Sequence, residues 1–152
     1  MRDCPYPIAA LLPHRPPMIL LDKVVAYDDS SIIAGVTIKE SSLFLEHEGV
    51  PGHVAIEYMA QACGAYAGAQ ALDTGGRVKV GFLLGTRLCR VLVPWFRIGD
   101  VLLVTASIVF HDEHMAAFDC RIEIDGRLAA DAQLKVYQPG DDELLINKGD
   151  ER

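Results

Sequence analysis

One charged residue interrupts a long apolar stretch in the middle of the chain. Residues 54–72 read VAIEYMAQACGAYAGAQAL, and Glu57 is their only charged side chain. His53 and Gln61 lie four residues before and after Glu57, so on a helix these three side chains share one face. A carboxyl group in apolar surroundings favours its neutral acid form, which can donate a proton near neutral pH. The pattern predicts a buried acid in an active site on a core helix.

The other histidines and the cysteines predict no metal centre. The four cysteines are widely spread and contain no CxxC pair,. His111 and His114 lie next to two acidic residues in an expected turn, but no second pair of ligands accompanies them,. The sequence also contains no nucleotide-binding motif. We therefore expect neither a metal nor another cofactor.

The reactive residues would lie on a helix running from about His53 to Leu72. Small residues recur along it, and Gly64 and Gly68 predict that another backbone approaches closely, since glycine otherwise costs helix stability,. An Asp125-Gly126 pair between two apolar runs predicts a two-residue hairpin,. The expected strands cover residues 18–27, 31–39, 78–84, 89–93, 101–110, 115–124 and 128–137. One long helix with a mainly antiparallel sheet is an α+β layout.

Composition limits the function classes. The 152 residues carry a net charge of -7 and are 51% hydrophobic, which predicts one domain with a sizeable core, over residues 1–138, and a charged tail over 139–152. An acidic chain is a poor partner for nucleic acid. The proline-rich start does not resemble a signal peptide, and the Ala- and Gly-rich run 54–72 fits a core helix better than a membrane span. Free thiols predict a cytoplasmic location.

Three separated blocks resemble a known family. They are LPHRPPMILLDKV at residues 12–24, VPGHVAIEYMAQACG at 50–64 and GFLLGTRLCRVLVPWFRIGD at 81–100. Together they resemble the hotdog-fold 3-hydroxyacyl-[acyl carrier protein] dehydratases, the FabZ/FabA-like group, over roughly residues 11–137. The second and third blocks look closest to a divergent branch linked to aryl polyene or related acyl chain synthesis.

The resemblance implies a sheet wrapped around the helix, homodimers or larger assemblies of dimers that join two sheets, and active sites at the dimer interface. The family's carboxylate falls on Glu57. Its histidine normally lies in a GHFPG-type loop of the other subunit, and that loop is shortened in this sequence. His47 holds the nearest loop position, whereas His53 stands where the family motif usually has an apolar residue. Which histidine is the base stays open.

The implied reaction is removal of water from a 3-hydroxyacyl thioester. A neutral imidazole would take the C2 proton, and the protonated acid of Glu57, oriented by Gln61, would give a proton to the leaving hydroxyl. Backbone amides near Gly52 and Gly85 could stabilise charge on the thioester oxygen. An apolar tunnel would hold the acyl chain. Its candidate lining residues are Tyr58 and Phe82, which could equally be ordinary core.

An acyl carrier protein is the expected partner. Carrier proteins are acidic, and the segment between Thr74 and Gly99 holds cations but no Asp or Glu. The candidate docking residues are Arg77, Lys79, Arg87 and Arg90, although a solvated face would look the same. Two other functions stay open. A hotdog thioesterase would use the same carboxylate to direct water at the thioester, and a non-catalytic acyl-binding subunit would explain the shortened histidine loop.

Overall fold

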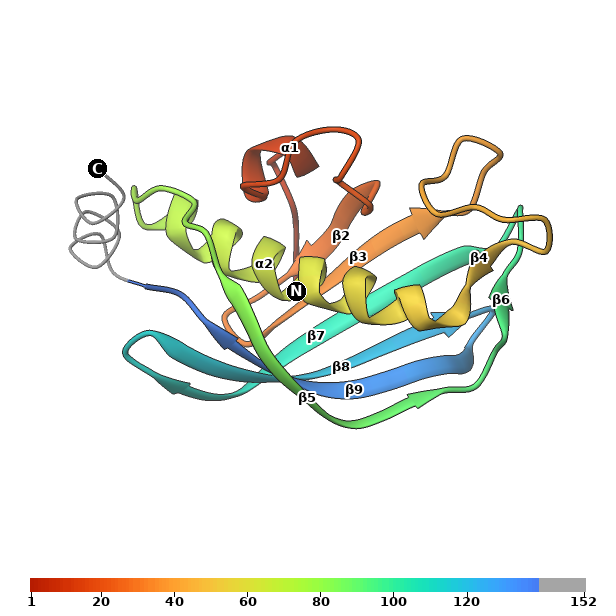
Figure 1. The fold of residues 1–152 in the computed structure, drawn as a ribbon. Helices are drawn as coiled ribbons and strands as arrows, with labels where there is room; N and C mark the ends of the chain where they lie inside the picture. Colours follow the sequence, from red (N-terminus) through yellow and green to blue (C-terminus); the bar gives the residue numbers. More distant parts are fainter. Residues whose placement is uncertain (140–152) are drawn as a thin grey trace, which may run out of the picture.

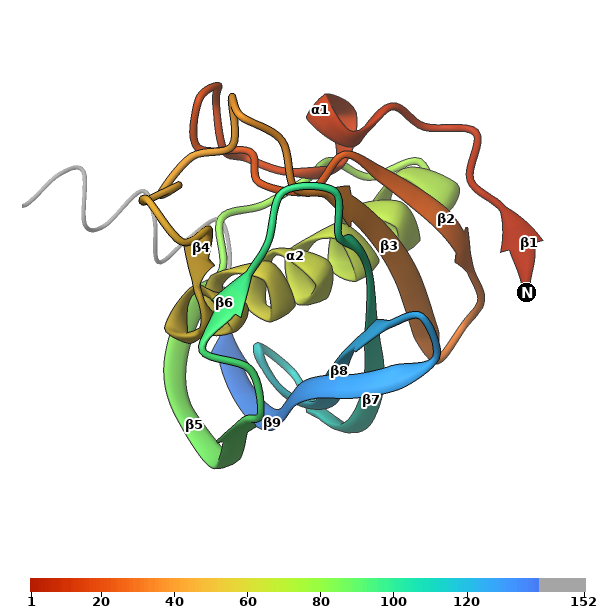
Figure 2. The same cartoon turned by 90° about the vertical axis from the view of Figure 1, so that its right-hand side faces the viewer.

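A long helix lies inside a curved sheet in the computed structural model, which describes residues 1–139 (Figures 1 and 2). The helix is α2 (Ala55–Asp73), preceded by a 3₁₀ turn, η1 (Gly52–Val54). A four-residue helix, α1 (Ile8–Leu11), packs against it. The strands are β1 (Arg2–Asp3), β2 (Lys23–Tyr27), β3 (Ser31–Thr37), β4 (Val50–Pro51), β5 (Phe82–Val91), β6 (Trp95–Phe96), β7 (Val101–Asp112), β8 (Met115–Ile124) and β9 (Arg127–Tyr137).

Seven of these strands form one antiparallel sheet in the order β1-β2-β3-β7-β8-β9-β5. Irregular pairing interrupts the register at several places, including between Ile108 and Phe110 on β7 and between Arg87 and Arg90 on β5. Such bulges bend and twist strands, and Figure 2 shows the sheet curling around α2. The separate pair β4–β6 lies beside the start of α2 and joins Val50 to Phe96. This layout is the expected hotdog fold.

Most of the predicted elements are present. β8 spans the predicted residues 115–124, and the Asp125-Gly126 turn has φ values of 52° and 76°, as a tight hairpin requires. The strands predicted at 78–84 and 89–93 are instead one strand, β5. The Thr-Arg dipeptide at 86–87 breaks its apolar pattern, and Leu88 has a positive φ of 52° inside the irregular stretch. The short strands β1, β4 and β6 were not predicted.

The small residues of α2 let a second backbone lie against it, as predicted. A Cβ on Gly68 would overlap the carbonyl oxygen of Leu11, at the end of α1, and a Cβ on Gly64 would lie 3.3 Å from a methyl group of Leu12. The opposite sides of α2 face β3, β7 and β8. Apolar side chains therefore occur all round the helix, as expected for one enclosed by other elements.

A polar network ties the end of α2 to the N-terminal segment. The hydroxyls of Tyr6 and Tyr27 and the guanidinium of Arg2 all donate hydrogen bonds to the carboxylate of Asp73. The Tyr6 bond, followed by those of Arg2 and Tyr27, lowers the pKa of Asp73, and the same bond raises the pKa of Tyr6 to about 12. The segment that runs along α2 is therefore attached at the far end of the helix as well.

The predicted tail, residues 139–152, lies outside the described residues except for Pro139. The assignment of residues 1–138 to one domain stays a prediction. Within residues 1–139, no helix combines the length and apolarity that crossing a membrane would need.

Replacing Gly68 by Ala should destabilise the protein. The new methyl group would overlap backbone atoms of Leu11, and overpacking of this kind costs roughly 1–3 kcal/mol, more than the gain of about 1 kcal/mol in helix propensity. The matched control is Gly64→Ala, whose methyl group meets only the mobile end of the Leu12 side chain. Urea unfolding should show a lower free energy of unfolding for Gly68→Ala than for Gly64→Ala. Equal stability of the two variants would contradict the close approach.

Candidate active site

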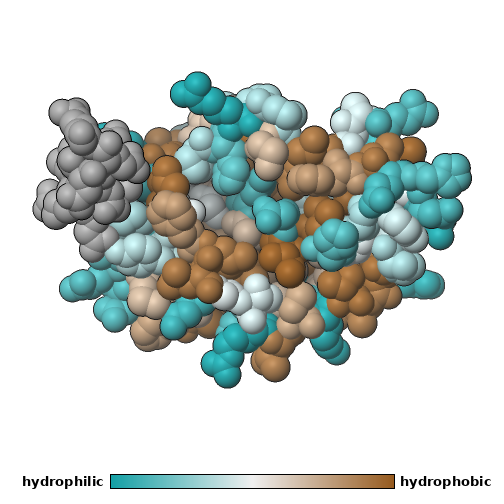
Figure 3. Space-filling model, in the orientation of Figure 1, coloured by the Kyte–Doolittle hydropathy of each residue, from teal (hydrophilic) through white to brown (hydrophobic). Residues whose placement is uncertain are grey.

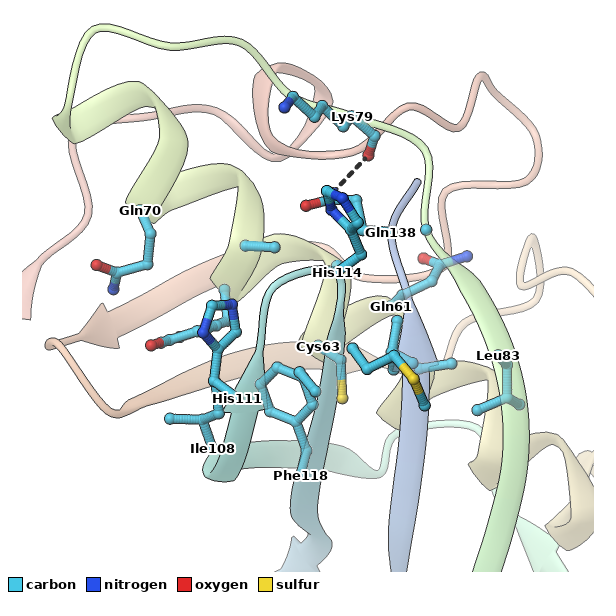
Figure 4. A pocket seen from close by; sticks show the side chains of 18 of the residues that line it. Gln61, Cys63, Gln70, Lys79, Leu83, Ile108, His111, His114, Phe118 and Gln138 are labelled. Carbon is cyan, nitrogen blue, oxygen red and sulfur yellow. Dashed lines mark hydrogen bonds between the residues drawn. The ribbon is translucent and has the colours of Figure 1, made fainter. Parts of the chain in front are cut away.

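A cavity of about 880 Å³ opens along one side of α2, between this helix, the start of β5 and the β7–β8 hairpin (Figure 4). Glu57, Ala60, Gln61 and Gly64 line it from the helix, and Pro13 and His14 from the N-terminal segment. Apolar side chains from the sheet form its middle. These are Leu83, Ile108, Met115, Phe118 and Val136. The shape and lining suit an extended, largely apolar ligand with a polar reactive group beside Glu57.

Glu57 reaches this cavity but is exposed in the single chain. The expectation of a buried acid is therefore wrong for one protomer. Glu57 lies in the first turn of α2. Covering this side chain and excluding water from it would require a second protein surface.

Gln61 is 2% exposed, and its amide bonds to backbone groups instead of Glu57. Its Oε1 accepts from the N–H of Leu20 at 2.8 Å, and its Nε2 donates to the carbonyl of Met18 at 2.7 Å. Gln61 therefore does not orient Glu57, as was predicted, but bonds the backbone of the N-terminal segment. Gln61 fastens the segment after His14 to the helix.

The two histidines expected as bases do not line the cavity. His47 is exposed in the loop between β3 and β4, and His53 is exposed in η1. His53 lies in η1, one turn before Glu57, and is not among the residues that line the cavity. The imidazoles that do line the cavity belong to His14, His111 and His114.

The predicted amide donors and tunnel residues lie elsewhere. The N–H of Gly52 donates to the carbonyl of Pro94 at 2.9 Å, and a Cβ there would overlap the carbonyl oxygen of Val93. Gly52 therefore serves packing of the β6 region against the helix start. Gly85 does not line the cavity, and open space surrounds the position that its Cβ would take.

The aromatic tunnel candidates also fail to line the cavity. Tyr58 is 2% exposed, packs edge-to-face on Phe96 with ring centroids 5.8 Å apart, and burial raises its pKa to about 12. Phe82 is 50% exposed on β5. The sequence did not predict the apolar residues that line the cavity in their place. Strand pairing of Leu83 with Val136 and of Ile108 with Phe118 places them, and alternation within single strands could not show which face would meet a cavity.

The polar end of the cavity lies at the β7–β8 hairpin. His111, Glu113 and His114 line it there with Lys79, whose carbonyl accepts a hydrogen bond from Gln138 at 3.3 Å (Figure 4). Within residues 1–139, no cluster of three or more His, Cys, Asp or Glu side chains is placed to hold a metal ion.

The four candidate docking cations divide into two groups. Arg77 and Lys79 lie on the connection between α2 and β5, whereas Arg87 and Arg90 lie on β5 itself. Arg90 pairs with Asp131 of β9, and this contact lowers the pKa of the Asp131 carboxyl. Docking of a carrier protein on these residues stays a prediction.

Comparison with known proteins places the chain among dehydratases. A family model described as "ApeP-like: ApeP dehydratase" matches residues 6–147. The 3-hydroxyacyl-[acyl-carrier-protein] dehydratase FabZ of Streptococcus pyogenes serotype M5 (strain Manfredo) is 33% identical over 132 residues, covering 84% of this chain and 92% of the relative. FabZ of Streptococcus mutans serotype c is 32% identical, with 84% and 91% covered.

Solved structures agree on the fold. "The Dehydratase Heterocomplex ApeI:P from Xenorhabdus doucetiae" contains a chain with a TM-score of 0.87 and 34% identity, covering 93% of this chain and 96% of that one. The E. coli PaaI protein has a TM-score of 0.60 and 17% identity, with 75% and 80% covered. The second similarity shows the shared hotdog architecture alone.

Proposed function

Because this chain belongs to the ApeP-like dehydratase family, we propose that it removes water from a 3-hydroxyacyl thioester to form a trans-2-enoyl thioester. The observation that carries the proposal is the position of Glu57, a carboxyl group beside an extended apolar cavity. A carrier protein or coenzyme A would hold the thioester. The family points to fatty acid or polyketide-like chain synthesis, including aryl polyenes, and we place this reaction in the cytoplasm.

The reaction needs two proton transfers, one to a base and one from an acid of the protein. Loss of the C2 proton and departure of the C3 hydroxyl leave a C2=C3 double bond, and a base and an acid accelerate these steps. Glu57 would supply the proton that turns the leaving hydroxyl into water. Leu83, Phe118 and Val136 would hold the acyl chain in the apolar middle of the cavity.

Replacing Glu57 by Gln should lower kcat by about 10²–10⁴-fold without unfolding the protein, since the side chain is exposed. The assay incubates the protein with a 3-hydroxyacyl thioester and follows enoyl product by mass spectrometry. Glu113→Gln, at the opposite end of the cavity, is the matched control and should retain most activity. Full activity of Glu57→Gln would exclude the proposed acid, whereas release of free thiol without enoyl product would favour a thioesterase.

We also propose that the chain works in a pair with a second hotdog subunit, either another copy or a related dehydratase. β5 is an edge strand in the seven-stranded sheet and all ten of its residues are exposed. Unpaired strand edges of this length are normally covered. Apolar surface gathers over β5 and beside α2 (Figure 3). The similar chain from Xenorhabdus doucetiae belongs to a dehydratase heterocomplex, which supports a non-identical partner.

A charge on β5 should break this pair. Leu84 is 53% exposed in the irregular stretch of β5, and Leu103, on the central strand β7, is 44% exposed. Native mass spectrometry, of the chain alone and co-expressed with a FabZ-type chain, should show that Leu84→Glu loses the dimer and Leu103→Glu keeps it. A monomeric wild-type chain under both conditions would contradict the pairing.

A further inference from the structure

The loop that carries His14 is fixed to α2 on both sides. Before it, Leu11 and Leu12 lie against Gly68 and Gly64 of the helix. After it, the amide of Gln61 holds the backbone of Met18 and Leu20. Only residues 13–17 lie between these attachments, three of them are prolines, and the N–H of Met18 closes a turn onto the carbonyl of Arg15 at 2.8 Å. The loop therefore has little freedom to move along the helix.

This loop leaves α2 beside Gly64 and returns to it at Gln61, four residues from Glu57, and the side chains of His14 and Glu57 both line the cavity. Along α2, from its end toward its start, Leu11 lies against Gly68 and Leu12 against Gly64. Glu57 and Gln61 follow on the helix, and they line the cavity together with Pro13 and His14. His14 is exposed, and within residues 1–139 its imidazole has no hydrogen-bond or ion-pair partner. An exposed imidazole without a protein partner can bond water or a ligand. The imidazole is thus free to meet a ligand.

The other histidines of the cavity are far from Glu57. His111 and His114 belong to the β7–β8 hairpin, which lies at the end of the molecule where α2 finishes (Figure 1). Glu57 is in the first turn of that helix, and Gln70, in its last turns, also lines the cavity. Gln70 is thirteen positions after Glu57 on the helix, a distance of about 20 Å at 1.5 Å per residue.

We propose that His14 is the base of the reaction and works with Glu57 of the same chain. This inference rests on the proposed dehydration. A neutral ring nitrogen of His14 accepts the C2 proton, and the C2–H electron pair becomes the C2=C3 π bond. As this π bond forms, the C3–O bond breaks with its electron pair on oxygen, and the hydroxyl leaves as water with the proton of Glu57. The imidazolium afterwards returns its proton to the Glu57 carboxylate, which restores both groups.

Chemical rescue separates proton transfer from a structural role. His14→Ala should lower kcat for enoyl formation by about 10²–10⁴-fold with little change in KM, and free imidazole in the buffer should restore part of the lost rate. Arg15→Ala, which removes the neighbouring exposed side chain of the same loop that does not line the cavity, is the matched control and should need no rescue. Retained activity of His14→Ala, or a loss of activity that imidazole does not restore, would overturn the role of His14 as base.

A binding measurement covers the case in which the chain alone turns over no substrate, which would count against the proposed function. The probe is a non-hydrolysable amide analogue of a 3-hydroxyacyl pantetheine, added to protein labelled with ¹³C-histidine. The His14 signal, identified by its absence in His14→Gln, should shift when the probe binds, even without turnover. Shifts in the signals of other histidines with an unmoved His14 signal would overturn the inference.

Discussion

Attachment of the N-terminal segment to α2 organises the whole site. The carbonyl end of α1 fits against Gly68 because that position has no side chain. The buried amide of Gln61 bonds the backbone of Met18 and Leu20, seven and nine residues after Leu11. A buried amide left without such partners would cost about 1–3 kcal/mol for each unsatisfied group. The segment is therefore held beside the helix at a defined register, and with it the wall of the cavity that faces Glu57.

The exposure of Glu57 follows from the same architecture. The sheet covers α2 from β3, β7 and β8, and the N-terminal segment covers another side, but the side toward β5 holds the cavity. In one protomer this side is open to water. The proposed second subunit, placed on the β5 edge, would close it. Pairing of the two subunits would then also exclude water from Glu57, as its proposed role as an acid requires.

The sequence predicted the fold better than the site. The periodic apolar runs located α2, β8 and β9, and the motif around Glu57 and Gln61 placed both residues at the cavity. The partner of Gln61 could not be predicted, because it depends on backbone groups about forty residues away in sequence. The aromatic tunnel candidate Tyr58 proved to be core, since its orientation follows from packing on Phe96.

The histidine at the cavity could not be predicted either, because its position depends on contacts that are distant in sequence. The family motifs favoured His47 and His53, which lie close to Glu57 in sequence, whereas the cavity includes His14, which is 43 residues away. Spacing along a helix could not find it. The signal was the LPHR block itself, an imidazole in a proline-rich segment. Only the attachment to Gly64 and Gln61 shows which wall of the cavity that segment forms.

A structure of the protein with a bound 3-hydroxyacyl pantetheine amide, in the presence of its partner subunit, tests the central claim most directly. The account predicts that the acyl chain lies between α2 and β5, with its C3 hydroxyl within about 3 Å of a Glu57 carboxyl oxygen, as a hydrogen bond requires. C2 should face the His14 imidazole. An acyl chain bound in this cavity with its hydroxyl turned away from Glu57, or bound outside the cavity altogether, would contradict the account.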